Sequence, residues 1–199
     1  ALKFLTPGTE EDGPEAHSRF LREARITAKL RSPHVARTLD FGQLDDGTQY
    51  MVMECLEGTD LGQLLARGEP IPIETAVDWV VQACDGLAEA HGLGAVHRDL
   101  KPSNLFLTTG LDGAPLVKVL DFGVSKATRL GEDTSEEQLT AAGMLLGSTR
   151  YMSPEQLQDA PTVDARSDVW ALGVILYELL TGQPPFKGAS PAITCALIL

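Results

Sequence analysis

The stretch HRDLKPSN at positions 97–104 constrains this chain more than any other feature of its sequence. It groups an aspartate, a lysine and an asparagine in one polar loop. An apolar segment with helical spacing precedes the loop, and a strand-like segment follows it. The tripeptide DFG comes at 121–123 and SPE at 153–155. Each motif alone could arise by chance in a surface loop, but the three in this order indicate one shared site.

The composition is that of an ordinary soluble globular protein. Of the 199 residues, 43% are hydrophobic and 22% are charged, and the length suits one domain or two small lobes. The longest apolar stretch, which begins at Val169, contains Glu178 and is too short to span a bilayer. Cys55, Cys84 and Cys195 have no CxxC spacing, so neither a disulfide framework nor a zinc site is indicated, and a cytoplasmic location is expected. The net charge of −12 argues against a nucleic-acid-binding surface.

Hydrophobic periodicity and turn residues divide the chain into a strand-rich beginning and a mostly helical remainder. This order predicts an α+β fold in two lobes. Strands are expected at 1–5, 35–42, 48–54, 104–107 and 116–120, and helices at 15–31, 73–91, 164–182 and from 193 onward.

The segment from 73 to 91 is expected to be a long core helix, and the segment from 129 to 147 a polar loop. Gly182 suits the C-terminal cap of the apolar helix before it. In the core helix, the residues at helical spacing are Ala76, Val77, Val80, Ala83, Cys84 and Leu87.

The three motifs are parts of one kinase signature set, and the chain resembles a serine/threonine protein kinase catalytic domain. Lys101 and Pro102 carry the serine/threonine assignment, because tyrosine-specific relatives generally have another residue in place of Lys101. The wording FLREARITAKLRSPHV at 20–35 and GSTRYMSPEQ at 147–156 is most similar to bacterial receptor-type, eukaryotic-like kinases. The resemblance covers nearly the whole chain and implies the two-lobed protein kinase fold.

The resemblance also implies a division into a partial N-lobe at 1–53, a hinge at 54–59 and a partial C-lobe at 60–199. The chain begins two positions before Lys3, so the G-x-G-x-x-G loop that covers the phosphates is not in it. The helices expected after residue 199 are missing too. The chain is therefore expected to be a fragment of a longer protein, truncated at both ends.

Four residues would carry phosphoryl transfer from Mg-ATP, a reaction that depends on positioning and charge neutralisation. Asp99 would accept the proton of a substrate hydroxyl, and Lys101 would reach the transferring γ-phosphate. Asn104 and Asp121 would bind Mg²⁺, which prefers carboxylate and amide oxygens. The alternative for Asp99 alone is a solvated turn aspartate.

Lys3 resembles the strand lysine that pairs the α- and β-phosphates of ATP. Its partner would be a helix glutamate, and Glu23 has a suitable position. Glu10, Glu11 and Glu15 are competing carboxylates, and a lysine near a terminus is often merely solvated.

The segment YMVMECLEG at 50–58 resembles the strand and hinge that meet adenine. Backbone groups of Glu54 and Leu56 would hydrogen-bond the base, and Asp60 would reach the ribose. The alternative is that the apolar side chains here are only core. Met53 would guard the inner pocket, and Phe106 and Ala1 would sandwich the adenine ring by apolar contact.

Arg98, before the catalytic aspartate, marks family members that are switched on by phosphorylation of the activation loop. Ser148 stands where the family usually has a threonine that bonds the catalytic aspartate and lysine, and it keeps the hydroxyl. Incidental hydroxyls in a polar loop remain the alternative for each acceptor. The candidate acceptors are Thr134, Ser135 and Thr140.

Two further residues would support the loop rather than act in the chemistry. Asp168 resembles the helix aspartate that anchors the backbone of the catalytic loop, and the ring of His97 would pack against Phe122. Ser103 stands where some relatives have an acidic residue, so no strong preference for basic substrates is expected.

The expected partners are ATP and protein substrates with serine or threonine acceptors, with self-association for autophosphorylation left open and no membrane segment within the chain. The resemblance allows the parent protein an anchor outside this chain. Three other functions stay open: a pseudokinase or scaffold, a small-molecule phosphotransferase and a pure interaction module. The intact set of Lys3, Asp99, Asn104 and Asp121 argues against the first and third, and the SPE segment with the Lys-Pro pair argues against the second.

Overall fold

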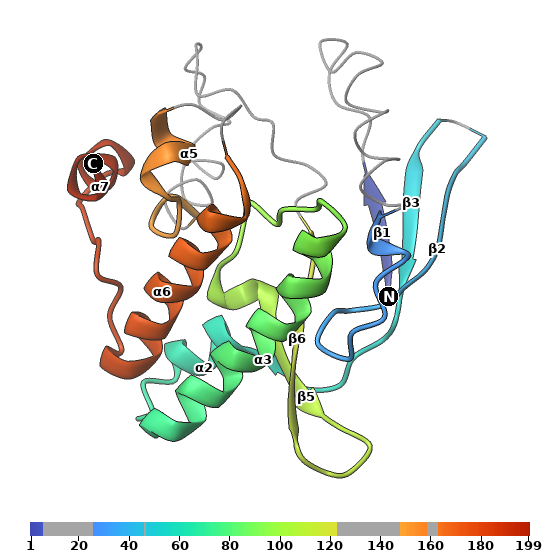
Figure 1. Ribbon diagram of the computed structural model, residues 1–199, viewed down its shortest axis with the longest axis horizontal. Helices are drawn as coiled ribbons and strands as arrows, with labels where there is room; N and C mark the ends of the chain where they lie inside the picture. Colours follow the sequence, from blue (N-terminus) through green and yellow to red (C-terminus); the bar gives the residue numbers. More distant parts are fainter. Residues whose placement is uncertain (6–25, 46, 123–147, 159–162) are drawn as a thin grey trace.

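Antiparallel sheets and helices make up the fold (Figure 1). In the first sheet the strand order is β1-β3-β2, and Lys3 of β1 lies opposite Met51 of β3. A turn with Gly47 at φ 88°, in the left-handed region that favours glycine, joins β2 to β3. The computed structural model describes residues 1–5, 26–45, 47–122, 148–158 and 163–199. The strands of this sheet are β1 (Leu2–Leu5), β2 (Thr38–Gln43) and β3 (Gln49–Met53).

The second sheet has the order β4-β5-β6 and begins after the connection 54–58. Its register places Asp60 opposite Phe106 and Phe106 opposite Lys118. Directly opposite residues in an antiparallel pair lie on the same face. The side chains of these three residues therefore leave one face of the sheet. The strands are β4 (Thr59–Asp60), β5 (Leu105–Thr109) and β6 (Pro115–Val119).

Helices make up most of the remaining described structure, and Figure 1 shows them on the side of the second sheet away from β1, β2 and β3. The Asp164 carboxylate caps the N-terminus of α6 by accepting from the Arg166 N–H, and Gly182 ends the helix at φ 71°. The helices are α2 (Leu61–Ala66), α3 (Ile73–Gly92), the 3₁₀ turn η1 (Pro102–Asn104), α5 (Pro154–Gln158), α6 (Ala165–Thr181) and α7 (Pro191–Ile198).

The main hydrophobic core lies where α3 packs on β6 and α6. Gly86 allows α3 a close approach to the loop before β2, because an added Cβ would lie 2.6 Å from the His34 carbonyl oxygen. Burying these apolar side chains stabilises the fold by roughly 25 cal/mol per Å² of apolar surface. The core includes Leu61, Leu87, Leu105, Val117, Val119 and Ile175.

The structure confirms the predicted helices at 73–91 and 164–182 and the predicted strands, with two corrections. Val77 and Cys84 are exposed rather than in the core, because the buried face of α3 is centred on Trp79, Ala83 and Leu87, and a helix buries one face only. Strand β2 begins three residues later than predicted.

The late start of β2 follows from backbone bonding to the second sheet. Val35 instead bridges β6 at Val119, and Ala36 donates its N–H to the Val119 carbonyl at 2.9 Å. The short elements β4, α2 and α5 were not predicted. Most of the predicted helix at 15–31 and the predicted loop at 129–147 lie outside the described residues.

Candidate active site

The loop 97–104 follows α3 and brings Asp99 and Lys101 together. The Lys101 Nζ lies 3.2 Å from the Asp99 Oδ2 and donates to the Ser148 Oγ at 3.3 Å. Ser148 is buried, and both other side chains are largely shielded, with 17% of Asp99 and 25% of Lys101 exposed. The three residues thus form one polar cluster, with an acceptor for a proton next to a cation.

Asn104 lies beside this cluster and closes the loop. Its Nδ2 donates to the Asp99 carbonyl at 2.8 Å, so the Oδ1 is the side-chain atom left to accept a cation. Its own carbonyl accepts the Leu120 N–H at 2.8 Å, which brings Asn104 next to the chain at Asp121. An amide oxygen and a carboxylate suit Mg²⁺.

Asp121 has φ 47°, in the left-handed region where a non-glycine residue is strained. Its Oδ1 lies 2.9 Å from the Lys3 Nζ, which joins the first sheet to the site. Among the described residues no group of three or more His, Cys, Asp or Glu could hold a metal. The predicted cation ligands are Asn104 and Asp121, and the remaining ligands would come from phosphate oxygens and water.

The predicted partner of Lys3 was Glu23, which lies outside the described residues. The partner that the structure gives Lys3 is Asp121. Both side chains of this pair are partly exposed, at 34% and 41%, so water screens the contact.

A buried carboxylate holds the backbone of the loop. Asp168 on α6 is 1% exposed and accepts the N–H groups of His97 at 2.9 Å and Arg98 at 3.0 Å. Its Oδ2 also lies 2.7 Å from the His91 Nε2. Arg98 has φ 64°, and its carbonyl accepts from the Gln156 side chain at 2.8 Å. These bonds hold Arg98 in a conformation that costs about 1–2 kcal/mol for an L-residue.

His97 is fully buried and lies against Phe122, with ring centroids 5.0 Å apart. Its Nε2 lies 2.8 Å from the Leu120 carbonyl, to which it donates, and its Nδ1 accepts the Asp99 N–H at 3.3 Å. Both roles require the neutral ring, and burial lowers the pKa of His97. His97 therefore supports the loop by packing and hydrogen bonding, as expected.

In the predicted nucleotide-binding segment, the Glu54 N–H and the Asp60 carboxylate already form hydrogen bonds within the protein. The Glu54 N–H donates to the Arg37 carbonyl at 3.0 Å, so the Glu54 carbonyl is the backbone group it can offer a ligand. The Asp60 carboxylate caps α2 by accepting from the Gln63 N–H at 2.9 Å and the Gln63 Nε2 at 2.6 Å. Its proposed contact with a ribose would have to share those oxygens.

Comparison with known proteins identifies the family. The model of the "Protein kinase domain" family matches residues 1–197.

The chain belongs to the protein kinase domain family.

Its named relatives are bacterial serine/threonine kinases. It is 43% identical over 173 residues to the serine/threonine-protein kinase pkn3 of Myxococcus xanthus, with 87% of this chain and 31% of that protein covered. It is 38% identical over 194 residues to the serine/threonine-protein kinase PknB of Mycobacterium leprae, with 96% of this chain and 29% of that protein covered. The chain thus spans about 30% of the length of these relatives.

The crystal structure of the Mycobacterium tuberculosis PknI kinase domain matches with a TM-score of 0.69 at 29% identity. The match covers 92% of this chain and 64% of that one. The predicted two-lobed kinase fold and the resemblance to bacterial serine/threonine kinases are confirmed.

The regulatory predictions for the kinase domain fall largely outside the described structure. Thr134, Ser135 and Thr140 lie outside the described residues. Ser148 is described, and it accepts from the Lys101 Nζ. No helix in the described part of the kinase domain combines the length and apolarity needed to cross a membrane.

Sequence reasoning missed a hydrogen bond between the segment after Ser148 and helix α6. The Tyr151 hydroxyl donates to the Glu178 Oε2 at 2.6 Å. Burial and the neighbouring carboxylate raise the pKa of Tyr151, so its hydroxyl keeps its proton. The one usable signal was that Glu178 interrupts the apolar stretch that begins at Val169.

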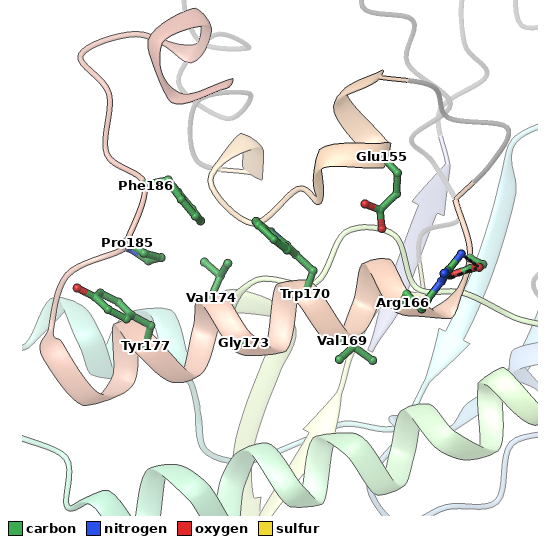
Figure 2. Close-up of a pocket in the computed structure, with 10 residues that line it drawn as sticks. Glu155, Arg166, Val169, Trp170, Gly173, Val174, Tyr177, Pro185 and Phe186 are labelled. Carbon is green, nitrogen blue, oxygen red and sulfur yellow. Dashed lines mark hydrogen bonds and ion pairs between the residues drawn. The ribbon is translucent and has the colours of Figure 1, made fainter. Parts of the chain in front are cut away.

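A pocket of about 790 Å³ lies along the other side of α6, and no predicted catalytic residue lines it. Figure 2 shows Glu155 and Arg166 toward one end and Tyr177 with Pro185 toward the other. The Trp170 ring stacks with Phe186, with centroids 5.9 Å apart. The pocket is therefore distinct from the cluster around Asp99.

Proposed function

We propose that this kinase domain transfers the γ-phosphate of Mg-ATP to serine or threonine hydroxyls of proteins. The cluster of Asp99, Lys101 and Ser148, with Asn104 and Asp121 beside it, carries the proposal. A scaffold that only binds has no evident use for this arrangement.

The proposed chemistry uses each side chain at one atom. A carboxylate oxygen of Asp99 accepts a hydrogen bond from the substrate hydroxyl and takes its proton as the oxygen attacks phosphorus. The Lys101 ammonium, 3.2 Å from that carboxylate, stabilises negative charge on the transferring phosphoryl group. Ser148 accepts a hydrogen bond from Lys101 and so orients the ammonium.

Asn104 and Asp121 would hold Mg²⁺ through the amide Oδ1 and the carboxylate, and the ion supplies charge neutralisation at the phosphates. Lys3, whose Nζ lies 2.9 Å from the Asp121 Oδ1, would contact the α- and β-phosphates. Backbone groups of Glu54 and Leu56 would bind adenine against Phe106, and Asp60 would reach the ribose.

The finer assignments are part of the same proposal. Residues 1–53 would serve as N-lobe, 54–59 as hinge and 60–199 as C-lobe. The kinase would act in the cytoplasm on protein substrates and switch on through phosphorylation at Thr134, Ser135 or Thr140, with the new phosphate pairing with Arg98. Self-association would bring one copy's loop to another copy's site.

The test is phosphate transfer by the full-length protein with Mg-ATP, read by mass spectrometry, beside an Asp99→Asn variant. Phosphate on the loop at 134–149 only when Asp99 is intact supports the proposal. Asp45→Asn is a matched control, because it makes the same chemical change at an exposed turn. ADP binding without transfer to the loop or to generic protein substrates would favour a pseudokinase.

A further inference from the structure

The side chain of Glu54 joins three segments that are far apart in the sequence. Its Oε1 accepts from the Lys118 Nζ at 2.7 Å and from the Arg37 N–H at 2.8 Å. The Glu54 N–H in turn donates to the Arg37 carbonyl at 3.0 Å. One carboxylate thus ties the chain before β2 and the end of β3 to strand β6 of the second sheet.

The pair of Glu54 and Lys118 is more shielded from water than the pair of Lys3 and Asp121. Side-chain exposure is 23% for Glu54 and 11% for Lys118, whereas the pair of Lys3 and Asp121 is at least one third exposed. Val117 and Val119, the neighbours of Lys118 in β6, are fully buried. A lysine in such a strand is costly without a partner, and removing one member of a shielded pair leaves an uncompensated charge.

The pair also borders the surface proposed for adenine. Lys118 lies opposite Phe106, so both side chains leave the same face of the second sheet. The Glu54 backbone supplies a carbonyl proposed to bind the base. The carboxylate held by Lys118 therefore belongs to the same residue that would meet the nucleotide.

We propose that Glu54 and Lys118 form a clasp that fixes the hinge backbone and so slows release of the nucleotide. Both side chains are positioning residues, since they act through the backbone at 54–56. A backbone already fixed has less conformational freedom to lose when adenine binds, which favours binding. The inference rests on the proposed function, because ATP and ADP are the ligands of that function.

The test uses three variants of the full-length protein: Glu54→Gln, Lys118→Met and the two combined. Glu54→Gln keeps an oxygen for the Arg37 N–H but loses the charge. The readouts are the release rate of a ribose-labelled fluorescent ADP with Mg²⁺, the KM for ATP, the single-turnover transfer rate at saturating ATP and the thermal unfolding midpoint.

Each single variant is expected to release ADP roughly tenfold faster and to raise the KM for ATP by a similar factor, within the usual range for coupled sites. In Lys118→Met the single-turnover rate at saturating ATP stays within about twofold, because the residues around Asp99 are unchanged. Both single variants melt at lower temperature, because an unpaired charge remains in a shielded place. The double variant regains much of the melting temperature but keeps the fast release.

The double variant separates a clasp from a merely structural pair. Recovery of slow ADP release together with the melting temperature would overturn the proposal, as would single variants that lose stability while releasing ADP at the parent rate. Lys187→Met is the matched control, since it removes an exposed lysine that contacts Gln183 at 3.1 Å, far from β6 in the sequence.

Failure of the clasp and failure of the proposed function are distinguishable. The clasp is read from ADP release, whereas the proposed function is read from phosphate transfer that depends on Asp99. A parent protein that binds ADP but transfers no phosphate defeats the function, and its ADP release still decides the clasp.

Discussion

The loop 97–104 and the contact of Lys3 with Asp121 are held in different ways. The loop is anchored by Asp168, which is 1% exposed and accepts two backbone N–H groups. The contact of Lys3 with Asp121 is a single ion pair, and at least one third of each side chain is exposed. The loop residues are therefore fixed by the fold, whereas the position of Lys3 relative to Asp121 contributes little to stability and is open to change by ligands.

The largest effect on stability is expected from Asp168→Ala. The change leaves the N–H groups of His97 and Arg98 without their acceptor in a buried place, and it removes the partner of the His91 ring. The free energy of unfolding should fall by about 3 kcal/mol or more, as measured by urea denaturation. Phosphate transfer should fall with it, because Asp99 follows directly on the released segment.

Asp45→Ala controls for the loss of a carboxylate at an exposed position. A free energy of unfolding that is unchanged in Asp168→Ala would remove the distinction between the two regions.

A smaller loss is expected from Tyr151→Phe. The Tyr151 hydroxyl donates to the Glu178 carboxylate at 2.6 Å, and hydrogen bonds to charged groups contribute about 1.5–3 kcal/mol. Urea denaturation should show that the free energy of unfolding falls by an amount in this range, and the thermal unfolding midpoint should fall with it. Tyr177→Phe is the control, because Tyr177 is 49% exposed on the same helix as Glu178. Equal losses in the two variants would mean that the bond to Glu178 is not the cause.

Acid should weaken the loop region through His97. In the folded protein, burial lowers the pKa of His97 below its ordinary value of 6.5. Between the two pKa values the unfolded chain therefore binds a proton that the folded chain does not. Stability from this group is complete above pH 6.5 and is lost as the pH falls toward the lowered pKa. The slope is at most about 1.4 kcal/mol per pH unit.

The measurement is the free energy of unfolding at several pH values between neutrality and mild acid, in the parent and in His97→Phe. The other histidines are the same in both proteins, so the difference in slope reports His97. Parallel slopes would contradict a neutral, buried His97.

The contrast between the two regions also explains what the sequence could predict. Asp99, Lys101 and Asn104 lie within one short loop, so their spacing along the chain already constrains their positions in space. The helices at 73–91 and 164–182 were predictable for a similar reason, since their apolar periodicity repeats over several turns.

Contacts between distant segments have no corresponding spacing or periodicity in the sequence. The bond of Tyr151 to Glu178 and that of Lys118 to Glu54 join residues far apart in the chain, and their only signal was a charged residue in an apolar segment. The start of β2 was misplaced because Val35 bonds to β6, a tertiary contact that strand propensity does not register.

The smallest effect on stability is expected from Lys3→Met, together with a large effect on activity. The pair with Asp121 is partly exposed and screened, so the free energy of unfolding should change by less than about 1 kcal/mol. Phosphate transfer should fall roughly 100-fold, because a cation proposed to meet the phosphates is lost. Urea denaturation and an Mg-ATP transfer assay on the same preparation measure both quantities, with Lys187→Met as the control. A stability loss as large as that of Asp168→Ala would show that Lys3 is an anchor of the fold. A large loss of activity with little loss of stability is expected only if the contact of Lys3 with Asp121 contributes little to the fold. This variant therefore tests the difference between the two regions most directly.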